Sequence, residues 1–170
     1  MPEYLAPGPV KERGLAPRLQ LKLLSGTSDR RAYVLAFGKG DEVASGLAEF
    51  AENQKLHSSH FAGIGAFADA KLAWFDRERK AYRVIAVPEP TEVVSLLGNV
   101  AHEKGKPIVH VHCALARKDG SMVGGHLLEA RVFPTLEIHL TEEPVLVEKV
   151  HDPETGLELL SLPQEGAGKG

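Results

Sequence analysis

The stretch Ile108-Val-His-Val-His-Cys-Ala-Leu-Ala-Arg-Lys-Asp-Gly-Ser-Met-Val-Gly-Gly-His126 has the pattern of two β-strands joined by a tight turn. Alternate residues of a strand point to the same face, so His110 and His112 share one face. The residues Lys118-Asp119-Gly120 suit a three-residue hairpin loop with Gly120 in the left-handed conformation. This segment therefore predicts an antiparallel hairpin that carries histidines.

The length of the loop decides where His126 points. With a three-residue loop, Arg117 faces Ser121 across the hairpin. Counting five residues along each strand from that pair then sets His112 opposite His126, with their Cβ atoms about 5 Å apart. In this register all three histidines lie on one face of the sheet.

Two alternatives would change this register. A two-residue Asp119-Gly120 turn would set His126 opposite Cys113 and move it to the other face, because side chains alternate along a strand. A bulge at Gly124-Gly125 would also change the direction of His126. The three-residue loop is the prediction that the structure has to test.

Three neutral imidazoles without a thiolate suit Zn²⁺ and leave a fourth position open for water or a substrate. Zinc in such a site lowers the pKa of bound water to roughly 7 or polarises a carbonyl as a Lewis acid. From the spacing alone, three ordinary histidines on a half-buried sheet remain the alternative. The site is predicted, but no reaction is assigned.

The remainder of the chain indicates an α+β fold around a mainly antiparallel sheet. A helix is predicted from Asp41 to about Gln54 because apolar residues recur there at helical spacing, with acidic residues at the positive end of the helix dipole. We expect Gly46 within this helix to mark a close contact with the sheet. Strands are predicted at Arg31–Phe37, Phe61–Phe67, Lys71–Asp76, Tyr82–Val87, Glu92–Leu97, Pro107–Ala116, Met122–Leu128, Thr135–Leu140 and Val145–Val150.

The overall composition is that of one soluble domain, with 43% hydrophobic and 25% charged residues in a chain of 170. We expect a loose N-terminal arm over residues 1–20, the domain over 21–150 and a C-terminal extension over 151–170. A formal charge of −3 argues against autonomous DNA binding, which usually needs a basic face. A single cysteine, Cys113, and the lack of an apolar run long enough to span a bilayer predict a cytoplasmic protein with no membrane partner.

The run from His110 to Leu128 resembles the central motif of the plants-and-prokaryotes-conserved (PPC) domain family. The resemblance extends back through Glu92–Gly98 and Gly63-Ile-Gly65, and forward to Glu137. It implies a single α/β domain, with a mainly antiparallel sheet and flanking helices, assembled as a homotrimer. It also implies that zinc is held by the histidines matching the three named above, at positions 110, 112 and 126. Plant members carry basic hooks that enter the DNA minor groove, and this sequence has no such segment.

Two carboxylates are candidates for orienting a metal-bound histidine or serving as a general base, namely Glu92 and Glu137. Cys113 is expected to be a small buried residue rather than a ligand. A cupin barrel, whose metal motif also opens with His-x-His, is the distant alternative, because the glutamate it needs is missing from Ala114–Lys118. The sequence thus predicts a zinc-binding PPC-domain protein that binds or transforms a small molecule. The competing hypothesis is a DNA-binding or protein-scaffolding regulator in which the metal is structural.

Overall fold

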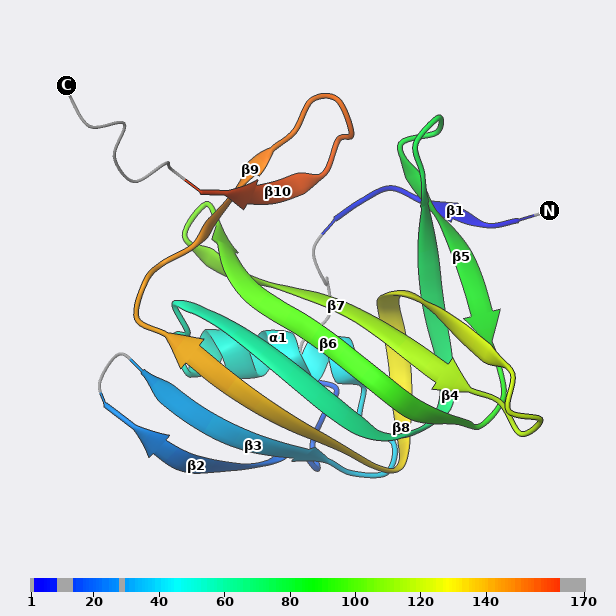
Figure 1. The fold of residues 1–170 in the computed structure, drawn as a ribbon, viewed down its shortest axis with the longest axis horizontal. Helices are drawn as coiled ribbons and strands as arrows, with labels where there is room; N and C mark the ends of the chain where they lie inside the picture. The colour runs from blue at the N-terminus through cyan, green and yellow to red at the C-terminus, as the bar shows by residue number, and fades with distance from the viewer. Residues whose placement is uncertain (1, 9–13, 28–29, 163–170) are drawn as a thin grey trace.

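Antiparallel strands make up most of the structure, a computed structural model that describes residues 2–8, 14–27 and 30–162 (Figure 1). Two of the strands are long and bent, β4 (Ser58–Asp76) and β8 (Met122–Glu143). The helix is α1 (Val43–Asn53). The other strands are β1 (Tyr4–Leu5), β2 (Gln20–Gly26), β3 (Arg31–Phe37), β5 (Ala81–Val87), β6 (Thr91–Glu103), β7 (Lys106–Ala116), β9 (Glu148–His151) and β10 (Glu158–Ser161).

The long strands β4 and β8 organise the sheet by pairing with each other along most of their length. Along its other edge, β4 pairs first with β6 and, nearer its end, with β5. Along its other edge, β8 pairs first with β7 and, nearer its end, with β3. Because β6 also pairs with β7, the strands β4, β6, β7 and β8 close on one another. This closure brings the β7–β8 hairpin beside β4 and β5.

Helix α1 packs against the sheet and contributes Val43, Leu47, Phe50 and Ala51 to the core. Glu42 caps it, because its carboxylate accepts hydrogen bonds from the amides of Ala44 and Ser45. A Cβ atom at Gly46 would lie 2.6 Å from Cε1 of Phe37 on β3, so the expected close contact with the sheet is confirmed. The predicted helix is confirmed as well, and the observed helix begins two residues later and ends one residue earlier than predicted.

Three parts of the prediction differ from the structure. Only one helix occurs among the described residues, so the expected additional flanking helices are wrong there. Two of the predicted strands form the single strand β4, and two others form the single strand β8, because the chain does not reverse direction between them. Register shifts in the pairing of β4 with β8 accommodate the bends of these long strands. The prediction missed β1, β2 and β10, and every residue of β2 is exposed.

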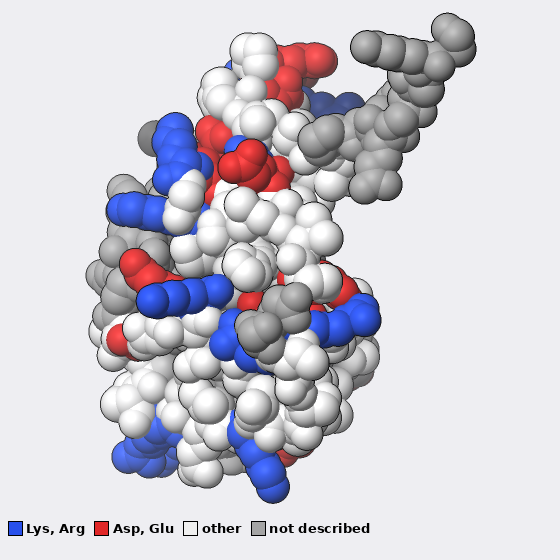
Figure 2. All heavy atoms as spheres, turned by 90° about the vertical axis from the view of Figure 1, so that its left-hand side faces the viewer, with Lys and Arg blue, Asp and Glu red and all other residues white. Residues whose placement is uncertain are grey.

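The chain ends add small strands to this sheet. β1 pairs with β5, and the β9–β10 hairpin joins β6 where Glu148 pairs with His102. The predicted division at residues 20 and 150 remains a prediction, and the β9–β10 hairpin spans the second of these boundaries. The helix in the described part of the chain is too short to cross a membrane. On the face shown in Figure 2, lysine and arginine side chains are interspersed with aspartate and glutamate.

Candidate metal centre

The β7–β8 hairpin has the predicted three-residue loop. The amide of Arg117 donates to the carbonyl of Ser121 at 2.9 Å, and the amide of Gly120 donates to the carbonyl of Arg117 at 2.9 Å. Gly120 has a φ of 81°, the left-handed conformation that the loop requires. Five residues along each strand, His112 pairs directly with His126. The predicted register is confirmed, and the two-residue turn is excluded.

The register also fixes the position of Cys113. Gly124 and Gly125 pair in step with Ala114 and Cys113, so no bulge displaces His126 from its predicted face. Cys113 lies on the opposite face, where burial raises the pKa of its thiol to about 12. Its predicted place as a small core residue is confirmed.

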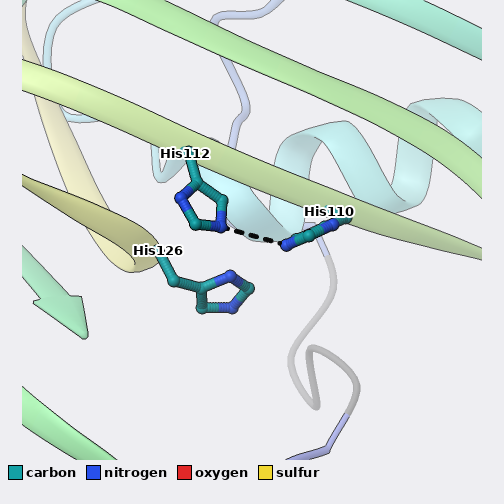
Figure 3. A group of neighbouring side chains, drawn as sticks. All are labelled: His110, His112 and His126. Atoms are coloured by element: carbon teal, nitrogen blue, oxygen red, sulfur yellow. Dashed lines mark hydrogen bonds between the residues drawn. The ribbon is translucent and has the colours of Figure 1, made fainter. Parts of the chain in front are cut away.

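The three histidine rings converge on one small space (Figure 3). Their centroids are 5.0 Å apart for His110 and His112, 5.2 Å for His110 and His126, and 5.4 Å for His112 and His126. The Nε2 atoms of His110 and His112 are 3.1 Å apart. One nitrogen from each ring can be chosen so that all three lie within 4.8 Å of one another.

This arrangement fits a transition metal. Nitrogens bound tetrahedrally to zinc at 2.0–2.1 Å are about 3.3 Å apart, close to the separation of the first two rings. The buried Nδ1 atom of His126 has no hydrogen-bond partner among the described residues, which is costly unless a ligand satisfies it. A borderline-soft ion such as Zn²⁺ suits three imidazoles better than Mg²⁺ or Ca²⁺, which prefer oxygen ligands. The donor set and the spacing therefore support a three-histidine metal site.

The protein environment keeps these imidazoles neutral at pH 7. Burial, together with smaller contributions from the charges of nearby histidines and of Lys149, lowers the pKa of His110 to about 4 and that of His126 to about 3. Burial also lowers the pKa of His112. Only neutral imidazole binds a metal, so the three rings are in the protonation state that metal binding requires.

Two residues beside this cluster were not identified from the sequence. The ring of Tyr82 on β5 stacks on His126, with centroids 4.8 Å apart and an angle of 13° between the planes. Lys149 on β9 is half-buried and acts electrostatically on His110 and His126. The hairpin between β4 and β5 was predictable, but the pairing of β4 with β8 that brings Tyr82 to His126 has no local signal in the sequence.

Glu92 and Glu137 lie together in a different part of the sheet. They line a surface hollow of about 370 Å³ with Ile64, Gly65 and residues of β6. Glu92 pairs with Ala116, four residues beyond His112, which is about 13 Å along a strand. The structure does not bring either carboxylate into the histidine cluster of the same chain, and their role at a metal stays a prediction.

The five remaining histidines also lie outside the cluster. His102 places its Nε2 atom 2.7 Å from the carbonyl of Leu56, and His151 pairs with Glu158 at 3.0 Å. These contacts tie strands and turns together. The others are His57, His60 and His139, which are exposed.

The fold and the site define a class of protein: a small domain with a closed set of antiparallel strands, one packed helix and three histidines on neighbouring strands. The sequence matches the model of the Plants and Prokaryotes Conserved (PCC) domain over residues 24–144. The chain therefore belongs to this family, which is the family of the resemblance described above. All three histidines lie within the match, and β9 and β10 lie beyond it.

Solved structures show the same fold. The chain is 31% identical to a plant- and prokaryote-conserved protein from Pyrococcus horikoshii, covering 86% of this chain and 97% of that one, with a TM-score of 0.74. It is 32% identical to a metal-containing protein from Archaeoglobus fulgidus, covering 84% and 99%, with a TM-score of 0.71. It is 30% identical to a candidate DNA-binding protein from Ralstonia eutropha, covering 77% and 91%, with a TM-score of 0.72. No match was found among curated proteins.

Proposed function

We propose that this chain is a zinc-binding protein whose three-histidine site takes a small molecule at the fourth position of the metal. The observation that carries the proposal is the convergence of three neutral imidazoles at a site where His112 is exposed. Three protein ligands with an open position are typical of catalytic zinc, whereas structural zinc usually has four. The metal-containing protein from Archaeoglobus fulgidus is similar to this chain over most of its length, which supports the proposal.

Zinc in this site would supply Lewis acidity to a bound carbonyl or water. The contribution of the chain itself is to hold the ligands in place. Tyr82 covers one face of the His126 ring, and the rigid β7–β8 hairpin fixes His112 opposite His126. The core includes Leu35, Phe67 and many other buried side chains, and a core of this size does not need a metal to fold, so a metal would be free to serve function.

A zinc titration in competition with a chromophoric chelator tests this proposal. Wild type should bind one zinc ion per chain, and the variant H110A/H112A/H126A should bind at least a hundredfold more weakly. A control variant, H57A/H60A/H139A, removes three exposed histidines outside the cluster and should bind zinc like wild type. Equal zinc affinity in wild type and the first variant would remove the basis of the proposal.

We also propose that the chain assembles as a homotrimer. Three large apolar side chains on the open face of the sheet are exposed, Ile64 (62%), Val94 (54%) and Leu97 (57%). Leu97 pairs with His112, so this apolar patch reaches the metal site. Exposed apolar patches usually mark interfaces, and the resemblance to the PPC family supplies the number three. Sedimentation should give a trimer for wild type, while Leu97→Lys should shift it towards the monomer. An unchanged trimer in that variant would exclude this patch as the interface.

The second candidate function is a DNA-binding or scaffolding regulator in which the metal is structural. It is favoured by the similarity to the candidate DNA-binding protein from Ralstonia eutropha. The formal charge of −3 does not favour it, and the face shown in Figure 2 carries mixed charges rather than a basic patch. Titration of a labelled duplex at low salt, where phosphate contacts are strongest, should show no binding. Salt-dependent binding there would favour the regulator.

A cytoplasmic location, proposed from the single cysteine, fits either function.

A further inference from the structure

The His126 ring is held differently from an ordinary metal-binding histidine. Neither of its nitrogens makes a hydrogen bond with any residue in the described ranges, and its Nδ1 atom is buried. A histidine that binds a metal through one nitrogen usually donates the other N–H to a carboxylate, a carbonyl or a water, and this bond fixes the direction of the ring. Within the described part of the chain no side chain or carbonyl does this for His126, so the direction of its ring depends on packing.

Tyr82 supplies that packing. Its ring stacks on the His126 ring, with centroids 4.8 Å apart and 13° between the planes. Nearly parallel rings at this separation are offset-stacked, which is a favourable arrangement for two aromatic rings. Because Tyr82 covers the face of the imidazole, it limits the tilt of that ring. It leaves the edge of the ring, where both nitrogens lie, free to bind a metal.

Tyr82 is itself firmly placed. Its backbone lies in β5 between two other strands, where it pairs with Phe75 on β4 and with Leu5 on β1. Its ring also contacts the ring of Phe75 edge-on, with centroids 5.4 Å apart and 66° between the planes. The Tyr82 hydroxyl makes no hydrogen bond with the residues that the structure describes. The ring, rather than the hydroxyl, therefore makes both contacts.

The close approach of β4 and β8 brings the two rings together. Ala73 on β4 pairs with His126, two residues before Phe75. A Cβ atom at Gly125 would lie 2.6 Å from the carbonyl oxygen of Ala73, so the strands can approach this closely only because residue 125 is glycine. The stack thus joins the β7–β8 hairpin, which carries the ligands, to the β4–β5 hairpin.

We infer that Tyr82 is a positioning residue of the metal site, whose aromatic ring fixes the plane of His126 in place of the usual hydrogen bond. The inference rests on the proposed three-histidine metal site and explains how one of its ligands is oriented. Phenylalanine at position 82 keeps the stack and serves as well as tyrosine. An aliphatic side chain leaves the His126 ring free to tilt, which weakens metal binding.

Zinc titration in competition with a chromophoric chelator tests the inference. Tyr82→Leu should bind zinc about tenfold more weakly than wild type, the lower end of the loss expected when a residue that orients a metal ligand is replaced. Tyr82→Phe should bind zinc like wild type. Trp74→Leu is the matched control, because it removes an exposed ring from the opposite face of β4, and it should also bind zinc like wild type.

The visible spectrum of the Co²⁺-loaded proteins gives a second readout, which a loss of stability alone does not move. Tyr82→Leu should change the spectrum because His126 binds at a different angle, whereas Tyr82→Phe should keep the spectrum of wild type. Urea unfolding of the metal-free variants shows whether each one folds. If Tyr82→Leu does not fold, NMR of the wild type decides. Nuclear Overhauser contacts between the Tyr82 and His126 rings should be present with and without zinc, and their absence in the zinc-bound protein overturns the inference.

The outcomes separate this inference from the proposed function. If Tyr82→Leu binds zinc as tightly as wild type, the inference is overturned and the metal site stands. If Tyr82→Phe binds as weakly as Tyr82→Leu, the hydroxyl is responsible, and the role given to the ring is wrong. If wild type binds no zinc, the proposed function and the inference fail together.

Discussion

Glu142 and Arg31 form a buried ion pair that gives a quantitative prediction for the stability of the fold. The Glu142 side chain is 1% exposed and the Arg31 side chain 21%. The Glu142 carboxylate accepts two hydrogen bonds from the Arg31 guanidinium and one from the amide of His57. Removing one partner of a buried pair costs about 3–5 kcal/mol, because the other charge stays buried and unpaired. Since Arg31 keeps some contact with water, Glu142→Gln should lower the free energy of unfolding by about 3 kcal/mol, the lower end of that range.

The adjacent pair of Arg30 and Glu143 provides the control. It has a similar length, 2.9 Å, but its side chains are 65% and 37% exposed. Exposed pairs contribute about 0–1 kcal/mol, so Glu143→Gln should have little effect. Urea unfolding of the metal-free protein, followed by circular dichroism, measures both variants under one condition. If the two substitutions cost the same, the argument from burial is refuted.

Three further predictions concern the metal site and its surroundings. His110 and His126 have pKa values of about 4 and 3 in the folded chain, below the ordinary 6.5, so the unfolded chain binds more protons between these values. The free energy of unfolding of the metal-free protein should therefore be highest above pH 6.5 and should fall as the pH is lowered towards 4. His126→Phe should make this fall smaller when urea unfolding is measured at about pH 7 and at about pH 5. The same fall in wild type and variant would contradict the prediction. Because the Cys113 thiol is buried, it should react with a thiol reagent only when the protein is unfolded. Rapid labelling of the folded protein would show instead that the thiol is accessible. Gly98→Ala should lower the free energy of unfolding by about 1–3 kcal/mol. The added Cβ would lie 2.5 Å from the carbonyl oxygen of His110 and 2.3 Å from Cζ of Phe61, which is too close for either contact. An unchanged stability in thermal unfolding would show that the strands can move apart.

The part of the site that could be predicted is the part that local sequence determines. The loop Lys118-Asp119-Gly120 specifies a turn type, and the turn type fixes the register that pairs His112 with His126. The helix could be predicted for the same reason, since its apolar spacing and its N-terminal acidic residues are close together in the chain. Local rules thus predicted the hairpin, the helix and the face of the hairpin on which the histidines lie.

Long-range pairing accounts for what could not be predicted. Tyr82 reaches His126 because Ala73 on β4 pairs with His126, a contact between residues 53 positions apart that no turn specifies. Glu92 and Glu137 matched the chemistry expected near a metal, but both pair with strand positions far from the histidines. Residue type alone did not reveal these distances.

X-ray absorption at the zinc edge, measured on protein purified without added metal, tests the central claim most directly. Three histidines and an open position predict three nitrogen neighbours at about 2.0–2.1 Å and one oxygen neighbour at about 2.0–2.2 Å, with the multiple-scattering pattern of imidazole. The signal should be lost in H110A/H112A/H126A. Purified protein that lacks zinc, or zinc with a sulfur neighbour or with six oxygen neighbours, would contradict the three-histidine site.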